Sequence, residues 1–307
     1  MTETHLVTNQ SQPLVGHNLF SQDRVLFDLV NRYGGDWSIA QLTAFGLTMG
    51  SQEAIDWACQ ANENQPVLKT HDRFGHRVDM VEFHPAYHNL MQTSIQYGLH
   101  NLPWKENKDG AHVARAAMLY MAFQNEAGHC CPISMTYSVI PALRKQPDIA
   151  ARWEALILSN EYDGRFLPAS QKKGVTFGMG MTEKQGGSDV RANTTTAEAW
   201  DAMEGGGEGA WRIVGHKWFF SAPQADAHLV LAQVADAGLS CFLVPRFLDD
   251  GSHNAVRVQR LKDKLGNRSN ASSEVEFTGA LGYPVGPAGR GIATILEMAG
   301  HTRLDCV

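Results

Sequence analysis

Apolar residues recur every three or four positions through the first half of the chain, which is the spacing of amphipathic helices. In the first such segment, Leu26, Leu29, Val30 and Tyr33 share one face. Ser21 is a candidate N-cap, and a glycine pair ends the segment. The same spacing predicts further helices over residues 38–49, 52–61, 85–97, 111–126 and 147–158.

Two parts of this half lack the helical period. The first twenty residues are polar, so we expect an arm that becomes ordered only by packing on a neighbour. Residues 67–83 are interpreted as either a hairpin or an irregular excursion, with a turn at 72–75. Little else resembles a strand, so the pattern predicts an all-α domain over residues 1–175.

After Gly174 the period changes to short β-prone runs separated by Gly, Asp, Asn and Pro. Regular short strands at this spacing predict a small antiparallel β-barrel over residues 176–285. Residues 203–209 are rich in glycine but flanked by acidic residues, so we interpret them as a flexible hairpin tip. The predicted strands cover residues 175–181, 194–200, 211–219, 228–234, 239–245, 255–261 and 272–277.

From Gly286 the pattern is helical again, with Ile292, Ile295, Leu296 and Ala299 on one face. A single helix of this kind has nothing obvious to bury its apolar face against, so we expect either an exposed stripe or a missing domain that covers it. We assign residues 286–307 to the start of a C-terminal helical domain. The fold class predicted is therefore α+β: helices, then a barrel, then one further helix.

Composition narrows the class of protein. With 307 residues, 43% hydrophobic and 19% charged, the chain has room for about two globular domains. A net charge of -6 argues against a generally basic nucleic-acid surface. We see neither a signal peptide nor an apolar run long enough for a membrane span, and expect a cytoplasmic protein. The odd number of cysteines, five, favours reduced and mostly buried thiols.

One stretch, residues 180–192, reads Gly-Met-Thr-Glu-Lys-Gln-Gly-Gly-Ser-Asp-Val-Arg-Ala and is too polar for a core. Adjacent glycines let backbone N–H groups approach a ligand, and Thr182 and Ser188 add short donors suited to phosphate or carbonyl oxygens. Composition alone leaves two interpretations open, a cradle for an anion or cofactor and an exposed turn.

Three blocks in order carry a resemblance. Residues 180–192 resemble the first signature of the acyl-CoA dehydrogenase family of flavoproteins. Residues 215–221, Gly-His-Lys-Trp-Phe-Phe-Ser, and 264–277, beginning Lys-Leu-Gly-Asn-Arg-Ser-Asn, are similar to two further strand motifs of that family. Asn270 stands where the usual pattern has Ser. The residues at each position of these blocks look most like those of the AidB branch, the alkylation-response flavoproteins.

The resemblance implies FAD as cofactor. Met181 and Thr182 would then meet the flavin pyrimidine edge, and Gly187 and Ser188 the pyrophosphate. Phe219 stands where an aromatic ring, usually Trp, packs on the flavin, and Ser221 where Thr usually lies near N5. The residues implied to bind the cofactor are Met181, Thr182, Gln185, Gly186, Gly187, Ser188, Phe219, Phe220 and Ser221. For the aromatic run at 218–220, plain barrel core is the alternative.

No catalytic residue is predicted. The family's base and its adenine contacts come from the C-terminal helical domain, of which this chain holds only the first helix. Glu183 and Asp189 do not match the motif of the base, and we expect Asp189 to fix the loop by a backbone hydrogen bond.

Three functions remain open at this point: a flavoenzyme that oxidises acyl-CoA, a flavoprotein of the alkylation response with weak dehydrogenase activity, and a remnant without flavin. The resemblance implies a homotetramer as the assembly. It also implies acyl-CoA and double-stranded DNA as partners, the DNA mainly through the C-terminal domain. The basic run of Arg257, Arg260, Lys262, Lys264 and Arg268 is interpreted as a solvated face or a phosphate contact.

Other clusters favour structural roles. His84 and His88 have helical spacing, but Pro85 follows the first and no third ligand lies near. The run His129-Cys130-Cys131 is interpreted as a packed helix–loop junction before Pro132. Gly178-Met179-Gly180 lacks the third glycine of a dinucleotide fingerprint.

Overall fold

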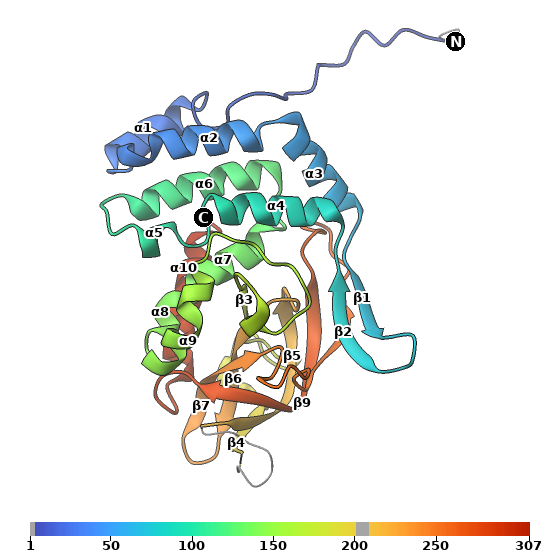
Figure 1. Ribbon diagram of the computed structural model, residues 1–307, viewed down its shortest axis with the longest axis vertical. Helices are drawn as coiled ribbons and strands as arrows, with labels where there is room; N and C mark the ends of the chain where they lie inside the picture. Colours follow the sequence, from blue (N-terminus) through green and yellow to red (C-terminus); the bar gives the residue numbers. More distant parts are fainter. Residues whose placement is uncertain (1–3, 201–208) are drawn as a thin grey trace.

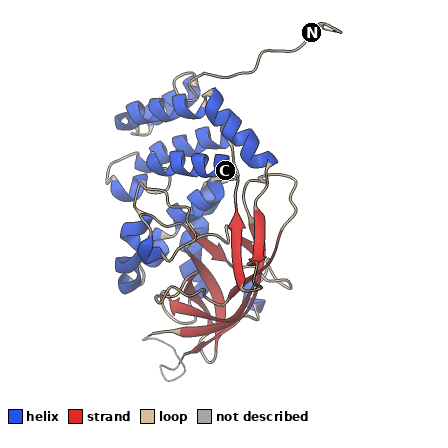
Figure 2. Ribbon diagram, turned by 45° about the vertical axis from the view of Figure 1, so that its right-hand side comes forward, coloured by secondary structure: helices blue, strands red, loops and turns tan. Residues whose placement is uncertain are grey.

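The computed structural model describes residues 4–200 and 209–307, so all of the predicted glycine-rich tip except Gly209 lies outside the described residues. Helices form one end of the molecule and the barrel the other, with the last helix running beside both (Figures 1 and 2). This arrangement confirms the predicted α+β class. The boundaries at 175 and 285 stay predictions.

The five helical ranges after residue 38 are confirmed to within about two residues at each end. The first helix is capped by Asp23, whose Oδ1 accepts a hydrogen bond from the Leu26 N–H, and not by Ser21. The helices of this part are α1 (Arg24–Arg32), α2 (Ile39–Met49), α3 (Gln52–Glu63), α4 (Pro85–Gln96), α5 (Leu102–Lys105), α6 (Ala111–Asn125), α7 (Cys130–Ser138), α8 (Ile140–Leu143) and α9 (Pro147–Ile157).

Helix α7 corrects the interpretation of residues 129–131 as a junction before Pro132. The helix begins at Cys130, so Pro132 lies in its first turn, where a missing N–H breaks no intrahelical bond. Every residue from Pro132 to Ser138 is buried. A helix buried on all sides has no polar face, so the periodic pattern could not reveal it.

The stretch at 67–83 is a hairpin, in which β1 (Val67–His71) pairs antiparallel with β2 (Arg77–Glu82). The side chain of Asp72 accepts hydrogen bonds from the N–H groups of Phe74 and His76 and so shapes the turn. Figure 2 shows the hairpin beside the barrel, outside the helical layer.

The barrel contains the predicted strands. The ring runs β6–β4–β5–β9–β7 and returns to β6, while β3 adds to β6 and β8 to β9. The pairs β3–β6 and β4–β6 are parallel, which the antiparallel prediction did not include. The strands are β3 (Phe177–Gly180), β4 (Thr196–Ala199), β5 (Trp211–Ser221), β6 (Ala227–Val234), β7 (Gly238–Pro245), β8 (Val256–Leu261) and β9 (Ser272–Pro284).

Asp226 explains why β3 and β6 run in the same direction. Its backbone N–H donates to the Thr176 carbonyl at 2.9 Å, and its Oδ2 accepts from the Thr176 N–H at 2.9 Å. These bonds hold the starts of both strands together. Lys172 donates to the other carboxylate oxygen at 2.7 Å, so both oxygens of the buried carboxylate accept a hydrogen bond.

Of the two expectations for the last helix, the exposed stripe is wrong. Helix α10 (Gly291–Leu304) buries Ile295 and Met298 against β6, β7, α7 and α8. The same core cluster includes residues of α8, α9 and β3 and so joins the helical part to one face of the barrel. Leu296 is the residue of the predicted stripe that stays exposed.

A buried ion pair fixes the end of α10. The Arg115 guanidinium, from α6, donates through both terminal nitrogens to the Asp305 carboxylate. The same guanidinium lies 3.4 Å from the centre of the Tyr137 ring, and Ser134 Oγ donates to Asp305 at 2.5 Å. The pair therefore connects α6, α7 and the residues just after α10.

The N-terminal arm lacks regular structure where the structure describes it, and its packing on a neighbour stays a prediction. Residues 4–18 contain no helix or strand and extend away from the helical layer (Figure 1). Leu6, Val7 and Leu14 are exposed, whereas Phe20, where the arm meets α2, is fully buried. In the part of the chain that the structure describes, no helix has the length and apolar character to cross a membrane.

Replacing Arg115 by Leu should cost roughly 3–5 kcal/mol of unfolding free energy, because Asp305 would keep a buried charge without a partner. Urea unfolding followed by circular dichroism measures this loss. The control is Arg152→Ala, which removes an exposed pair with Asp249 and should cost less than about 1 kcal/mol. Equal effects of the two substitutions would contradict the role given to the buried pair.

Candidate functional site

A cleft of about 490 Å³ lies where α6 and α7, the ends of β3 and β5, the β8–β9 loop and the end of α10 meet. Four of the nine residues predicted to bind the cofactor line it: Met181 and Thr182 from the first block, and Phe219 and Ser221 from the second. The third block contributes Lys264, Asn267, Asn270 and Ser272. The three sequence blocks therefore converge on one cavity.

Phe220, one of the nine residues predicted to bind the cofactor, does not line the cleft. It is 1% exposed and stacks on His228 in the barrel core, with ring centres 3.9 Å apart, whereas Phe219 is 51% exposed. Strict alternation from the inward-facing Lys217 would bury Phe219 instead. An irregularity in the β5–β9 register between Lys217 and Phe220 shifts the alternation by one residue.

The other predicted cofactor residues of the first block lie beside the cleft, outside its lining. Gln185 donates to Glu183 Oε2 at 2.6 Å, so its amide serves the loop, and Gly187 and Ser188 are exposed. None of Gln185, Gly186, Gly187 and Ser188 lines the cleft. A Cβ added at Gly187 would come within 3.0 Å of Thr182 Cγ2, so this glycine allows the loop to lie close to a cleft residue.

A buried ion pair between Glu183 and Lys217 holds the first and second blocks together. Lys217 Nζ donates to Glu183 Oε1 at 2.6 Å, and both side chains are fully buried. Thr195 donates to Glu183 through its N–H and its hydroxyl, and Thr194 through its N–H. We did not predict this pair, although opposite charges in two otherwise constrained blocks are a signal for it.

The pair explains why Glu183 is not a base. Burial alone would raise the pKa of its carboxyl, but the Lys217 ammonium and the Thr195 hydroxyl outweigh burial and lower the pKa to about 2. At neutral pH the carboxylate is therefore charged, and its oxygens already accept hydrogen bonds from Lys217 and the two threonines. Asp189 accepts a hydrogen bond from the Arg191 N–H, as predicted for a residue that fixes the loop.

A second buried carboxylate supports the floor of the cleft. Glu126 accepts hydrogen bonds from the N–H groups of Gly128 and His129 and from Ser269 Oγ at 2.7 Å. Burial opposes the charge, but these donors and the His129 ring lower the pKa of Glu126 to about 2. Ser269 thus ties the third block to the start of α7, where Cys130 lines the cleft.

Several polar groups of the cleft are free to meet a ligand. In the described ranges, 4–200 and 209–307, the Thr182 hydroxyl makes no hydrogen bond and Asn270 Oδ1 is buried without a partner. The Ser221 and Ser272 hydroxyls lie 3.4 Å apart. Buried polar atoms normally have partners, so these atoms suit a ligand that carries both donors and acceptors. A flavin ring meets that requirement, and Phe219 offers an exposed aromatic face to it.

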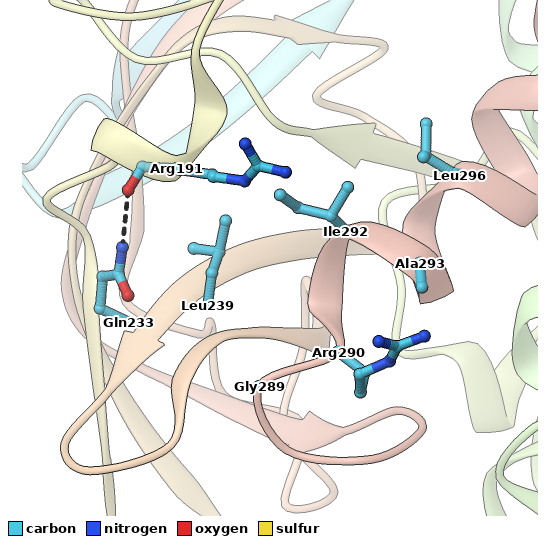
Figure 3. A pocket seen from close by; sticks show the side chains of 8 residues that line it. All are labelled: Arg191, Gln233, Leu239, Gly289, Arg290, Ile292, Ala293 and Leu296. Carbon is cyan, nitrogen blue, oxygen red and sulfur yellow. Dashed lines mark hydrogen bonds between the residues drawn. The ribbon is translucent and has the colours of Figure 1, made fainter.

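A second hollow, also about 490 Å³, lies on the far side of the first block (Figure 3). Arg191 reaches over it from the 3₁₀ turn Val190–Ala192, and Ile292 and Leu296 of α10 line the opposite wall. Gln233 Nε2 donates to the Arg191 carbonyl at 3.1 Å and fixes that turn. The first block therefore runs from the cleft, at Met181, to this hollow, at Arg191.

The other clusters have structural contacts. His84 Nδ1 accepts from the Ala86 N–H and caps α4, while His88 pairs with Tyr162. Among the described residues, no group of three or more His, Cys, Asp or Glu side chains is placed to hold a metal ion. In the basic run, Arg260 and Lys262 both donate to Glu274, and Lys264 donates to backbone carbonyls.

The fold and the cleft define a protein of the acyl-CoA dehydrogenase class. The profile of the adaptive response protein AidB N-terminal domain matches residues 9–164, and that of the acyl-CoA dehydrogenase middle domain matches residues 178–280. The chain belongs to the AidB family of acyl-CoA dehydrogenase-like flavoproteins. The predicted resemblance is thereby confirmed.

Two relatives show how far the similarity extends. AidB of Escherichia coli K12 is 51% identical over 99% of this chain and 55% of its own length. The structure of Caenorhabditis elegans ACDH-11 in complex with C11-CoA superposes with a TM-score of 0.85 at 28% identity, over 99% of this chain and 52% of that one. The chain spans about half the length of these curated relatives.

More distant structures share the fold. Glutaryl-CoA dehydrogenase of Mycobacterium smegmatis in complex with FADH2 superposes with a TM-score of 0.54 at 17% identity, over 71% of this chain and 52% of that one.

Replacing Lys217 by Met should lower the unfolding free energy at pH 7 by roughly 3–5 kcal/mol, because Glu183 would remain buried and charged without its partner. In the native chain the pKa of Glu183 in the folded state, about 2, lies below its ordinary value of 4.5. The charged carboxylate therefore contributes to the unfolding free energy above about pH 4.5, and this contribution is lost as the pH falls toward about 2. The deficit of the variant should therefore be smaller at pH 3 than at pH 7.

Urea unfolding at the two pH values measures this difference. Lys173→Met is the control, because Lys173 forms an exposed pair with Glu161. A Lys217→Met deficit that does not change with pH would contradict the charge state given to Glu183.

Proposed function

We propose that this chain binds FAD, with the flavin ring in the cleft, and serves a flavoprotein oxidoreductase that acts on acyl-CoA thioesters. The observation that carries the proposal is the meeting of Met181 and Thr182 with Phe219 and Ser221 on one cavity, although the two pairs are far apart in sequence. The FADH2 complex of the Mycobacterium smegmatis relative supports the choice of cofactor.

Each cleft residue has a role in holding the ring. Phe219 provides an apolar face for stacking, and the Thr182 and Ser221 hydroxyls provide short donors to its polar edge. The Glu183–Lys217 pair fixes the strand and the loop that carry them, so these donors are held in place before a ligand arrives. The exposed N–H of Gly187 and hydroxyl of Ser188 would meet the pyrophosphate. When bound, the flavin supplies an acceptor for hydride.

The substrate class follows from the relative and from the cleft walls. The Caenorhabditis elegans relative was solved with C11-CoA. Here the cleft is partly lined by the apolar side chains of Phe123, Met135 and Met179, which suit an acyl chain. We therefore propose an acyl-CoA as the ligand that shares the cleft with the flavin.

The described residues do not complete the chemistry. Asp305 is the only carboxylate among the described residues that line the cleft, and Arg115 and Ser134 already occupy it. Proton abstraction needs a free base within reach of the substrate, so we assign that role to no residue of this chain.

The alkylation response and double-stranded DNA belong to the proposal only through the AidB resemblance. The pairing of Arg260 and Lys262 with Glu274 reduces the positive charge available to phosphates in this part of the protein. A homotetramer likewise stays a prediction of the resemblance.

Replacing Gly187 by Val should abolish FAD retention, because the new side chain would meet Thr182 and block close approach to the loop backbone. The purified chain is incubated with FAD, desalted and measured for flavin absorbance between about 350 and 450 nm. The matched control is Gly300→Val, where an added Cβ meets nothing within 4 Å. Flavin retention by the Gly187→Val variant at the native level would refute the placement.

The FAD-loaded chain should bind octanoyl-CoA without losing its flavin absorbance, since no free base lines the cleft among the described residues. Anaerobic titration with octanoyl-CoA, followed by dithionite, separates binding from reduction. Perturbation of the flavin spectrum without bleaching is the expected result, and bleaching by octanoyl-CoA alone would show that a base has been overlooked.

A further inference from the structure

A smaller cavity, of about 250 Å³, lies between β2, α4, the segment after α9 and the start of the barrel. It shares no lining residue with the cleft. Phe83 and Tyr87 stack with ring centres 4.2 Å apart on one side, and Tyr162 and Phe166 complete the aromatic wall. The cavity is thus a separate compartment with an aromatic wall, and charged side chains also line it.

Arg246, just after β7, is the unusual member of this wall. Its side chain is 14% exposed, and its guanidinium carbon lies 4.7 Å from the Phe166 ring centre. Within the described residues the guanidinium donates no hydrogen bond, and the buried Nε has no partner. Burial lowers the pKa of Arg246, as expected for a cation whose charge is poorly compensated.

The acidic groups nearby do not supply the missing partner. Asp226 Oδ1 lies 3.7 Å from Arg246 but already accepts a hydrogen bond from Lys172 at 2.7 Å. Asp163 accepts three hydrogen bonds from Arg165, two from the guanidinium and one from the backbone N–H. Asp79 lines only a neighbouring cavity of about 20 Å³, which Arg246 also borders. Its Oδ2 accepts from Arg77, and its Oδ1 is buried without a hydrogen-bond partner in the described part of the chain, so it does not reach Arg246. Glu82 also lines the cavity, and its carboxylate pairs with Lys69 at 3.6 Å. Each nearby carboxylate thus has another cation as its partner, and the charge of Arg246 is left over at the cavity.

A second polar group of the same cavity lacks a partner. Gln224 forms a single hydrogen bond, of 3.2 Å between its Nε2 and the Tyr87 hydroxyl, and its buried Oε1 is unpaired among the described residues. In either orientation of the amide, one polar atom of Gln224 stays free. Buried unpaired polar atoms are costly, so two of them on one cavity indicate a place for a polar ligand.

We propose that this cavity binds a small carboxylate with a flat apolar body. The single surplus charge suits a monoanion, and the forked donors of a guanidinium match the two oxygens of a carboxylate. The aromatic wall suits a planar ring, and the free atom of Gln224 can contact a polar substituent. This site is independent of the flavin proposal, because it shares none of the cleft residues.

Benzoate is the probe, and isothermal titration calorimetry of the 307-residue chain is the measurement. We expect saturable binding of benzoate, no detectable binding of the neutral analogue benzamide, and affinity for benzoate at least roughly tenfold weaker in Arg246→Gln, which loses the charge-assisted bonds. Arg257→Gln is the control, because Arg257 borders only the neighbouring small cavity and should bind benzoate as the native chain does.

Arg246→Lys guards against a variant that does not fold. It keeps the charge but loses the fork, so a folded Arg246→Lys chain with affinity at least a few-fold weaker supports the proposal. Circular dichroism confirms folding of each variant. Failure of the native chain to bind benzoate, equal binding of benzamide, or unchanged affinity in both Arg246 variants would overturn the proposal, as would tighter binding of inorganic phosphate than of benzoate.

Discussion

The ion pair between Glu183 and Lys217 is the constraint on which the cleft depends. It joins a loop after β3 to the middle of β5, and both side chains are excluded from water. Two charges in such a place are stable only together, because either alone would pay a large desolvation penalty. If the loop moved away from the strand, each charge would remain in the protein interior without its partner. The residues on either side of the pair therefore keep their positions relative to each other.

This constraint acts together with the irregularity in β5 just beyond Lys217. The pair fixes the inward orientation of Lys217, and the register shift that follows places Phe219 on the cleft and Phe220 in the core. A regular strand would have exchanged the two rings. The aromatic face of the cleft thus results from two local features of one strand, a buried charge and an extra residue in the pairing.

Much of the architecture could be predicted from the chain alone. Helices with one polar face, such as α3 and α4, have the periodic pattern, and the short strands are marked by their turn residues. The pattern did not reveal α7, whose residues are nearly all buried, or the core beneath α10. It also did not reveal the parallel pairs, because the bonds between Thr176 and Asp226 join residues far apart in sequence.

The site shows the same division. Sequence resemblance selected Met181, Thr182, Phe219 and Ser221, which meet on the cleft, but it could not separate Phe219 from Phe220, since that depends on a single register shift. Arg246 and Gln224 carry no local signal at all. Their lack of partners is visible only when the groups that pack around them from β2, α4 and the segment after α9 are in place.

The core cluster that runs from α8 and α9 through β3 to α10 has a mechanical consequence. Because helices and barrel share it, the two parts of the described chain have no hinge of low contact between them, and hydrophobic packing resists their separation. A molecule entering the cleft therefore meets walls of set spacing. Selection among ligands in this part of the protein would rest on the size and shape of side chains such as Met135 and Met179, and not on closure of one part of the chain around the ligand.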